Sequence, residues 1–288
     1  MKMEAEKDDI YDSMDQVKVL VATPNYTNMF ESSVHTNHIE CVSKWTEWGI
    51  DFNWTIIGRT FVQFARTQLC QVAADGKFTH IFFVDDDAVI DPETLPRFIK
   101  HDKDIIMAPY PMRRYPHEIG VLSAENWRDH GTYENLTFDD MDQGLIEVAG
   151  GGTHCMLIKV DVFHKKGTIA HSNSTETPSL FEEDEEALRV GPGGTSGTPF
   201  FVMPKTGTED MYFCYRAKLK GAEVWCDTDV FADHVGFSPV ITRSWAEYGE
   251  TSKKQNRVKS NGKELTFIAG SDERSEKIVR LNKAANIV

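Results

Sequence analysis

HIFFVDDDAVID (residues 80–91) is the stretch that decides the fold of this chain. Its apolar run at residues 81–84 is typical of a short strand that is buried on both faces of a sheet. Asp85, Asp86 and Asp87 follow at the point where such a strand leaves the sheet. Ligands bind at the carboxyl ends of strands in open α/β sheets, and three adjacent carboxylates repel one another unless water or a cation separates them. The stretch therefore predicts a divalent cation site at a strand end, with a solvated acidic turn as the alternative.

Length and composition indicate a soluble globular protein with one large domain or two small ones, because 288 residues with 40% hydrophobic content can bury an ample core. The net charge of −14 argues against a nonspecific nucleic-acid coat, although it is compatible with a local basic patch. The five cysteines are widely spaced without a CxxC pair, which predicts reduced core thiols. No apolar leader or membrane-length stretch is present in the sequence, so a cytoplasmic location is expected (the host cytoplasm for a viral protein).

Strand-like and helix-like segments alternate along most of the chain, which predicts an α/β fold with a Rossmann-like, mixed and mostly parallel sheet. Thr60, Asp91 and Thr208 stand where helix N-caps are expected. Strands are expected at residues 17–23, 50–57, 81–84, 104–108, 145–149, 154–160 and 224–226, and helices at residues 30–48, 61–75, 92–100, 162–166 and 208–220.

Three segments fall outside this alternation. Residues 1–16 form an acidic tail, and residues 171–198 are a polar, acidic and then glycine-rich insert that is too long for an ordinary connection. We expect the insert to be a mobile lid within a single domain of residues 17–245. Residues 246–288 are basic, which predicts either a solvated tail or a contact surface for an anionic partner.

Several residues near expected strand ends are candidates for ligand contacts. The exit of the first expected strand could present an aromatic ring and backbone groups to a ligand, and an ordinary connecting loop is the alternative. This exit comprises Thr23, Pro24, Asn25 and Tyr26.

Arg66 lies on the helix that leads into the acidic strand. We expect it either to contact a phosphate or ribose of the ligand or to be a solvated helix arginine. Arg113 and Arg114 follow another strand, and solvated loop arginines are an equal interpretation. Gly151 and Gly152 belong to a triple glycine, which allows close approach to a ligand or forms a bulge.

The order of these motifs resembles the GT-A fold of nucleotide-sugar glycosyltransferases, family 2-like, over residues 17–236. DDD stands where that family has its DxD metal motif, and DHVG at residues 233–236 is similar to the segment that supplies a metal-binding histidine. The resemblance implies Mn²⁺ or Mg²⁺ on Asp85, Asp87 and His234, with Asp86 near the donor.

Glu209 and Asp210 resemble the ED pair at the start of the family's catalytic helix, which implies Asp210 as general base in an inverting transfer. FARTQL, around Arg66, is similar to the ARN helix that holds the nucleotide, and it differs by the missing asparagine. The implied activity moves a sugar, expected from a UDP-sugar, to an acceptor hydroxyl. The donor contacts expected are the first-strand exit, Arg66 and Asp86. Arg113 and Arg114, beside the expected phosphate site, and Gly151 and Gly152 are further candidates for substrate contacts.

Two other classes remain in view. A nucleotidyltransferase would also use metal-binding carboxylates, but TPNYTN after the first strand lacks the expected glycine-rich phosphate loop. A noncatalytic nucleotide-sugar-binding module would not need the paired metal and base residues. The acceptor stays open among a glycan, a lipid-linked molecule, a small molecule, a protein and, as in some phage enzymes of this general kind, hydroxymethylated DNA bases.

Overall fold

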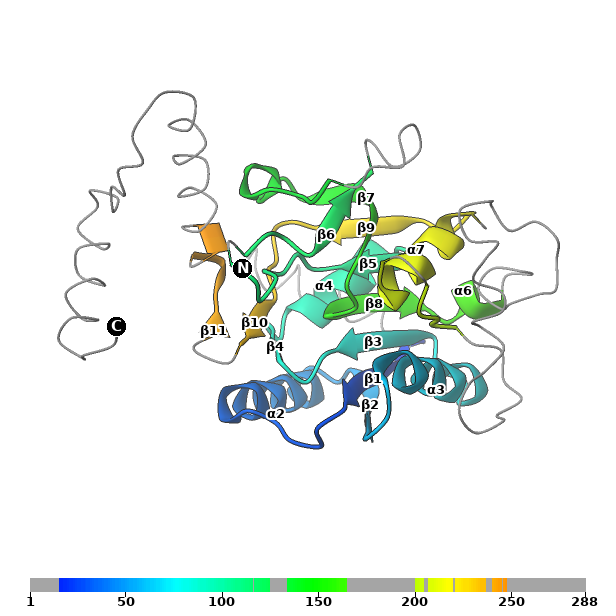
Figure 1. The fold of residues 1–288 in the computed structure, drawn as a ribbon. Coiled ribbons are helices and arrows are strands. Elements are labelled where there is room, and N and C mark those ends of the chain that lie inside the picture. The colour runs from blue at the N-terminus through cyan, green and yellow to red at the C-terminus, as the bar shows by residue number, and fades with distance from the viewer. Residues whose placement is uncertain are drawn as a thin grey trace, which may run out of the picture.

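The computed structural model describes residues 16–115, 117–124, 134–164, 200–204, 207–219, 221–236, 240–244 and 246–247 (Figure 1). The expected lid at residues 171–198 lies outside the described residues, as do the acidic tail except Gln16 and the basic segment except residues 246–247. Within the described part, no helix combines the length and the apolar character that crossing a membrane would require.

An eight-stranded sheet forms the centre of the described structure, in the order β2-β1-β3-β8-β5-β9-β7-β6. Six strands run in the direction of β1, while β7 and β8 run the opposite way. The predicted α/β class with a mixed, mostly parallel sheet is therefore confirmed. The strands are β1 Lys18–Asn25, β2 Asp51–Gly58, β3 His80–Val84, β5 Ile105–Met107, β6 Val121–Ser123, β7 Leu145–Gly151, β8 Cys155–Lys159 and β9 Val224–Asp227.

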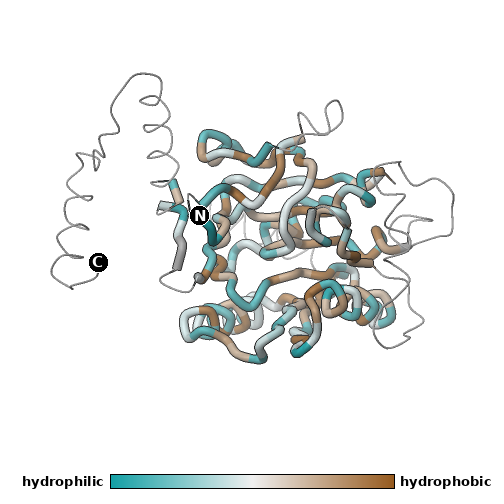
Figure 2. Tube along the Cα trace, in the orientation of Figure 1, coloured by the Kyte–Doolittle hydropathy of each residue, from teal (hydrophilic) through white to brown (hydrophobic). Residues whose placement is uncertain are grey.

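Helices cover both faces of the sheet because alternate strand residues point to opposite sides. In β3, for example, Ile81 and Phe83 join the core on one face, and Phe82 and Val84 join the core on the other. Helices α3 Val62–Asp75, α6 Asp161–His164 and α7 Glu209–Leu219 pack on the first face, and α2 Ser32–Glu47 and α4 Thr94–His101 on the second. Figure 2 shows the hydrophobic residues recurring along the central strands. All five cysteines are buried and unpaired, as predicted.

Of the expected helix caps, Thr60 is wrong. Helix α3 begins after Phe61, whose side chain cannot cap, and Thr60 lies in the bend before it, next to Arg59 with its φ of 57°. Helix α4 is assigned from Thr94, and Asp91 makes the expected capping bond at the turn that leads into it, since its Oδ1 accepts the N–H of Glu93 and its carbonyl accepts the N–H of Thr94, both at 2.9 Å. Thr60 is thus not a cap, whereas Asp91 caps the turn that opens into α4. A short 3₁₀ helix, η1 Phe138–Asp140, lies in the connection from β6 to β7.

A small three-stranded sheet, in the order β11-β10-β4, was not predicted from the sequence. It joins β4 Ala88–Val89, which follows the acidic run directly, to β10 Asp233–Val235 and β11 Val240–Ile241. Since His234 pairs with Ala88 and the N–H of Val235 donates to the Asp87 carbonyl at 2.8 Å, this sheet brings the late histidine to the acidic run.

Candidate active site

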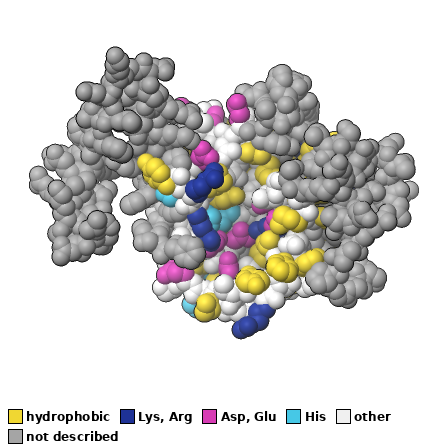
Figure 3. Space-filling view, in the orientation of Figure 1, with side chains coloured by type: hydrophobic (Ala, Val, Ile, Leu, Met, Phe, Trp, Pro, Cys, Tyr) yellow, Lys and Arg dark blue, Asp and Glu magenta, His cyan; other side chains and the backbone are white. Residues whose placement is uncertain are grey.

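A cavity of about 680 Å³ lies at the carboxyl ends of β1 and β3. Figure 3 shows acidic and histidine side chains at the centre of this face, with arginine or lysine side chains and hydrophobic side chains beside them. The cavity thus lies where parallel strands of an open sheet present their ends to a ligand. Its wall comprises Pro24, Tyr26, Thr27, Met29, Phe30, Glu31, Thr60, Val62, Arg66, Asp85, Asp86, Asp87, Arg113, Val235 and Gly236.

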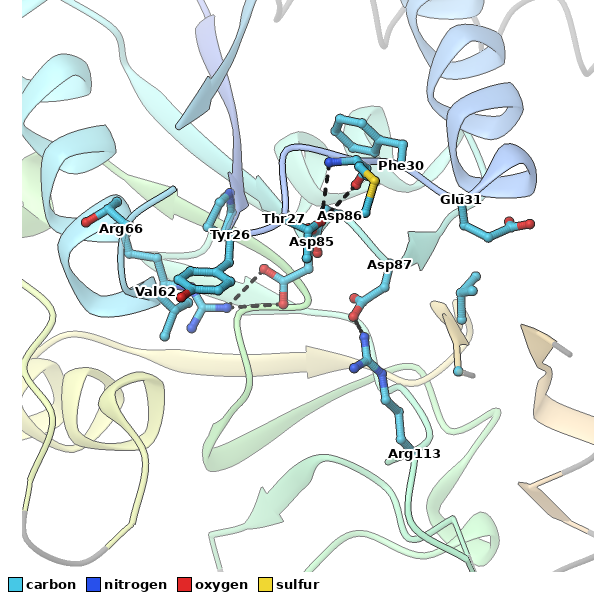
Figure 4. Close-up of a pocket in the computed structure, with 15 residues that line it drawn as sticks. Tyr26, Thr27, Phe30, Glu31, Val62, Arg66, Asp85, Asp86, Asp87 and Arg113 are labelled. Atoms are coloured by element: carbon cyan, nitrogen blue, oxygen red, sulfur yellow. Dashed lines mark hydrogen bonds and ion pairs between the residues drawn. The ribbon is translucent and has the colours of Figure 1, made fainter. Parts of the chain in front are cut away.

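The three carboxylates of the acidic turn, residues 85–87, have different partners (Figure 4). Asp85 accepts hydrogen bonds from Nη2 of Arg66 at 2.9 and 3.1 Å. Burial alone would raise the pKa of Asp85, but the charge of Arg66 and the contact with His154 outweigh it and hold that pKa well below its usual range. For Asp86, burial and the neighbouring Asp85 charge raise the pKa to about 6. Asp87 forms an ion pair with Arg113.

Asp87 also faces two histidines. Its Oδ1 lies 3.4 Å from Nδ1 of His154, and its Oδ2 lies 3.4 Å from Nε2 of His234. The other nitrogen of each ring is hydrogen-bonded to a backbone carbonyl: Nε2 of His154 to Asp233 at 3.1 Å, and Nδ1 of His234 to Pro111 at 2.9 Å. Because a carbonyl only accepts, each of these nitrogens carries a proton, so whenever a ring is neutral its nitrogen that faces Asp87 is the unprotonated one, with a lone pair for a metal ion.

This arrangement fits a divalent metal ion. One candidate ligand atom from each of Asp87, His154 and His234 lies within 4.8 Å of the others. Each carboxylate oxygen of Asp87 faces one imidazole nitrogen, and Oδ1 of Asp87 is buried without a hydrogen-bond partner among the described residues. Burial, followed by the effect of His154, lowers the pKa of His234 to about 3, so the ring is neutral and able to coordinate at neutral pH.

His154 was not among the residues expected at the site. It stands one residue before β8, and β8 runs antiparallel to β3 with Cys155 opposite Val84. This register places His154 beside Asp85, whose N–H donates to the His154 carbonyl at 3.1 Å. The expected ligand set of Asp85, Asp87 and His234 thus differs from the group in the structure, where the Asp85 carboxylate is held by Arg66.

Arg66 lines the cavity but is buried, with 6% of its side chain exposed. Besides Asp85, it forms an ion pair with Glu209, whose side chain is 5% exposed. Burial raises the pKa of Glu209, while the Arg66 charge acts in the opposite direction. Both groups are therefore committed to a buried ion-pair network that joins α3, the acidic turn and α7.

Asp210 lies beside Glu209 in the first turn of α7 and is not among the residues that line the cavity. Its Oδ1 accepts the Thr208 hydroxyl and the N–H of Met211, the latter at 2.8 Å. Its Oδ2 accepts no hydrogen bond from the described residues, and it lies 3.2 Å from the place that a Cβ on Gly152 would take. Thr208 occupies the N-cap place, since its carbonyl accepts the N–H of Tyr212 at 3.0 Å.

The remaining predicted residues divide between the cavity wall and the protein interior. Pro24 and Tyr26 line the cavity, whereas Thr23 is buried and its Oγ1 accepts the indole N–H of Trp54 at 2.9 Å. Asn25 is also buried, and its side chain donates to the Met29 carbonyl at 3.1 Å. Thr23 and Asn25 thus support the loop that carries Tyr26.

Arg113 lines the cavity, while its neighbour Arg114 is exposed and does not. A Cβ on Gly151 would lie 2.5 Å from Sδ of Met107, and one on Gly152 would lie 2.0 Å from the Tyr110 hydroxyl. The space beside each glycine is therefore filled by a side chain of the protein itself, Met107 at Gly151 and Tyr110 at Gly152.

No protein-family model matches the chain, and no curated protein matches it either. Among solved structures, A197 from STIV is similar at 14% identity over 76% of this chain and 86% of its own, with a TM-score of 0.42. GalNAc-T7 with UDP, GalNAc and Mn²⁺ is similar at 10% identity over 94% of this chain and 55% of its own, with a TM-score of 0.43. Apo UDP-glucose pyrophosphorylase is similar at 9% identity over 88% of this chain and 86% of its own, with a TM-score of 0.36. Likenesses at this level carry no argument about activity.

Proposed function

We propose that this protein is a metal-dependent glycosyltransferase that moves a sugar from a nucleotide-diphosphate donor, a UDP-sugar, to an acceptor hydroxyl. One observation carries the proposal: Asp87 belongs both to the wall of the cavity and to the group of Asp87, His154 and His234 that fits a divalent cation. A cation there would neutralise charge that develops on a nucleoside diphosphate leaving group. Mn²⁺ suits two imidazoles and a carboxylate better than Mg²⁺, which prefers oxygen ligands.

The cavity wall offers separate places for the parts of a donor. Tyr26 is 65% exposed and its ring stacks with that of Phe61 at a centroid distance of 6.3 Å, so it presents an aromatic surface for a base. Arg113 is positioned beside Asp87, where it can neutralise a phosphate. Asp86 lies on the same wall.

For the acceptor, we propose Asp210 as the general base in a single inverting displacement. Its Oδ1 is fixed by two hydrogen bonds, and its Oδ2 accepts none from the described residues, so this oxygen is available for the proton of a hydroxyl. Glu209 holds Arg66 and is assigned to positioning the helix.

The test is incubation of the protein with UDP-sugars and Mn²⁺, followed by measurement of released UDP. Release by the wild type, but not by Asp87→Asn, is expected, and Asp51→Asn in β2 serves as a control because Asp51 is an exposed carboxylate on a strand. A nucleotidyltransferase would instead release pyrophosphate from a nucleoside triphosphate and a sugar phosphate. Binding of UDP without release of either product would indicate a binding module.

The acceptor is identified by a screen read by mass spectrometry. The panel contains glycans, small molecules, peptides and DNA with hydroxymethylcytosine. A mass gain of one sugar on a single class identifies the acceptor. For DNA, transfer should fall steeply with salt, because binding to a polyanion releases counterions.

A further inference from the structure

We infer that in the free protein Arg113 pairs with Asp87 in the position that the divalent cation takes when it binds. Binding of the cation then displaces the Arg113 guanidinium from Asp87 to a phosphate of the ligand. The inference deepens the proposed function and depends on its cation site, but not on the transfer of a sugar.

The first reason is that the guanidinium and the cation need the same atom. Arg113 forms an ion pair with Oδ2 of Asp87, and this oxygen also faces Nε2 of His234 at 3.4 Å. A cation coordinated by Asp87 and His234 would lie next to that oxygen, where a guanidinium would be repelled by it. Only one of the two positive groups can occupy the position.

The second reason is the difference between Arg113 and Arg66, the other arginine on the acidic turn. The Arg66 side chain is 6% exposed and is held by two carboxylates, so it cannot leave without uncovering buried charge. The Arg113 side chain is 47% exposed, and its only ion pair within the described part of the chain is with Asp87, so leaving costs less than it would for Arg66. Of these two arginines, Arg113 is therefore the one that a cation can displace from the acidic turn.

The third reason is that the exchange requires no movement of the backbone. The loop that carries Arg113 is anchored by the N–H of Met112, which donates to the Glu118 carbonyl at 2.8 Å, and by pairing of Pro111 with Ile119. The Pro111 carbonyl in the same loop fixes the tautomer of His234. A loop that orients a metal ligand stays in place while the long Arg113 side chain turns.

The displaced guanidinium remains over the cavity, whose wall it helps to form. A diphosphate that binds the cation would bring negative charge to the same end of the cavity. Arg113 would then pair with a phosphate oxygen in place of Asp87, and arginine is well suited to such a contact.

The experiment compares the wild type with Arg113→Gln in two measurements that have opposite expected signs. Mn²⁺ binding without nucleotide is measured by electron paramagnetic resonance. Arg113→Gln should bind about two- to fivefold more tightly, because an exposed competing ion pair is gone. Pyrophosphate binding at saturating Mn²⁺ is then measured by calorimetry, and here Arg113→Gln should bind more weakly. Arg59→Gln, which removes an exposed cation between β2 and α3, should change neither value.

An Mn²⁺ affinity of Arg113→Gln that is equal to or below that of the wild type would overturn the exchange, and so would a wild type that binds no Mn²⁺. Unchanged pyrophosphate affinity would overturn the transfer of Arg113 to phosphate. Neither measurement uses a sugar donor. If both give the expected signs and no UDP-sugar is turned over, the proposed glycosyl transfer fails while the exchange at Asp87 stands.

Discussion

Arg66 in α3 and Glu209 at the first position of α7 form a buried ion pair, although 143 residues separate them in the chain. The same guanidinium donates to Asp85 at the end of β3. One side chain therefore links the helix that precedes the acidic strand, the acidic turn itself and the helix that carries Asp210. We infer that this network fixes the proposed base relative to the cation site.

Replacing Arg66 by methionine should strongly destabilise the fold. The change leaves the carboxylates of Asp85 and Glu209 without their common partner, and breaking a buried pair in this way costs on the order of 3–5 kcal/mol. Urea unfolding of Arg66→Met at pH 7 measures the loss. Arg66→Met with Glu209→Gln should recover part of it, because one of the uncompensated charges is removed. A loss below about 1 kcal/mol, the range of surface pairs, would contradict the network.

Replacing His154 by alanine should weaken Mn²⁺ binding about tenfold or more while the protein stays folded. The change removes one of the two imidazole nitrogens that face Asp87, and His154 is the ligand candidate that differs from the set implied by the family resemblance. Electron paramagnetic resonance titration without nucleotide provides the measurement. His35→Ala serves as the control because His35 is exposed on α2. If instead Asp85→Asn lost Mn²⁺ and His154→Ala kept it, the two-aspartate set would be correct.

The fold could be predicted because its signals are local. The four-residue apolar run before Asp85 became β3, and alternate residues of that run fill the cores on both faces of the sheet. The helix cap at Thr60 was wrong, since a polar residue before a helical pattern does not reveal whether a bend intervenes, whereas Asp91 makes its capping bond although the helix is assigned from Thr94.

Of the group of Asp87, His154 and His234, local sequence signals could predict only Asp87. Asp87 follows its strand directly, so its place at the sheet edge needed no long-range information. His154 reaches Asp87 through the antiparallel pairing of β8 with β3, and Arg66 meets Glu209 through packing of two helices on one face. Strand order and register of that kind have no signature in a single sequence. Family resemblance supplied His234, which β10 brings to the turn by pairing with β4.

Acid should weaken the fold partly through Asp227, which ends β9 and does not line the cavity. Burial would raise its pKa, but hydrogen bonds from Arg97 and His101 outweigh burial and lower it. Because the folded pKa lies below the unfolded value of about 3.9, the stabilisation is present above about pH 4 and is lost as the pH falls through the folded pKa. Urea unfolding of the wild type and Asp227→Asn at pH 7, 5, 4 and 3 should show a difference that shrinks below pH 4. A difference that is constant with pH would mean that the Asp227 charge does not contribute.

Replacing Asp210 by asparagine should slow sugar transfer by about 10²–10⁴-fold, the usual contribution of a general base. An asparagine Oδ1 can still accept the Thr208 hydroxyl and the N–H of Met211, so the start of α7 should keep its geometry and the melting temperature should change little. Donor affinity should also persist, because Asp210 does not line the cavity. Rapid-quench kinetics with a saturating UDP-sugar measure the rate, and proton NMR of the first product reads the anomeric configuration. Inversion is expected because a single base and in-line attack give one displacement.

Glu209→Gln provides the contrast, since loss of a charge that holds Arg66 should lower the free energy of unfolding, which Asp210→Asn should not. Retention in the product, or an Asp210→Asn rate near that of the wild type, would leave Asp210 the role of holding Thr208 and the first turn of its helix.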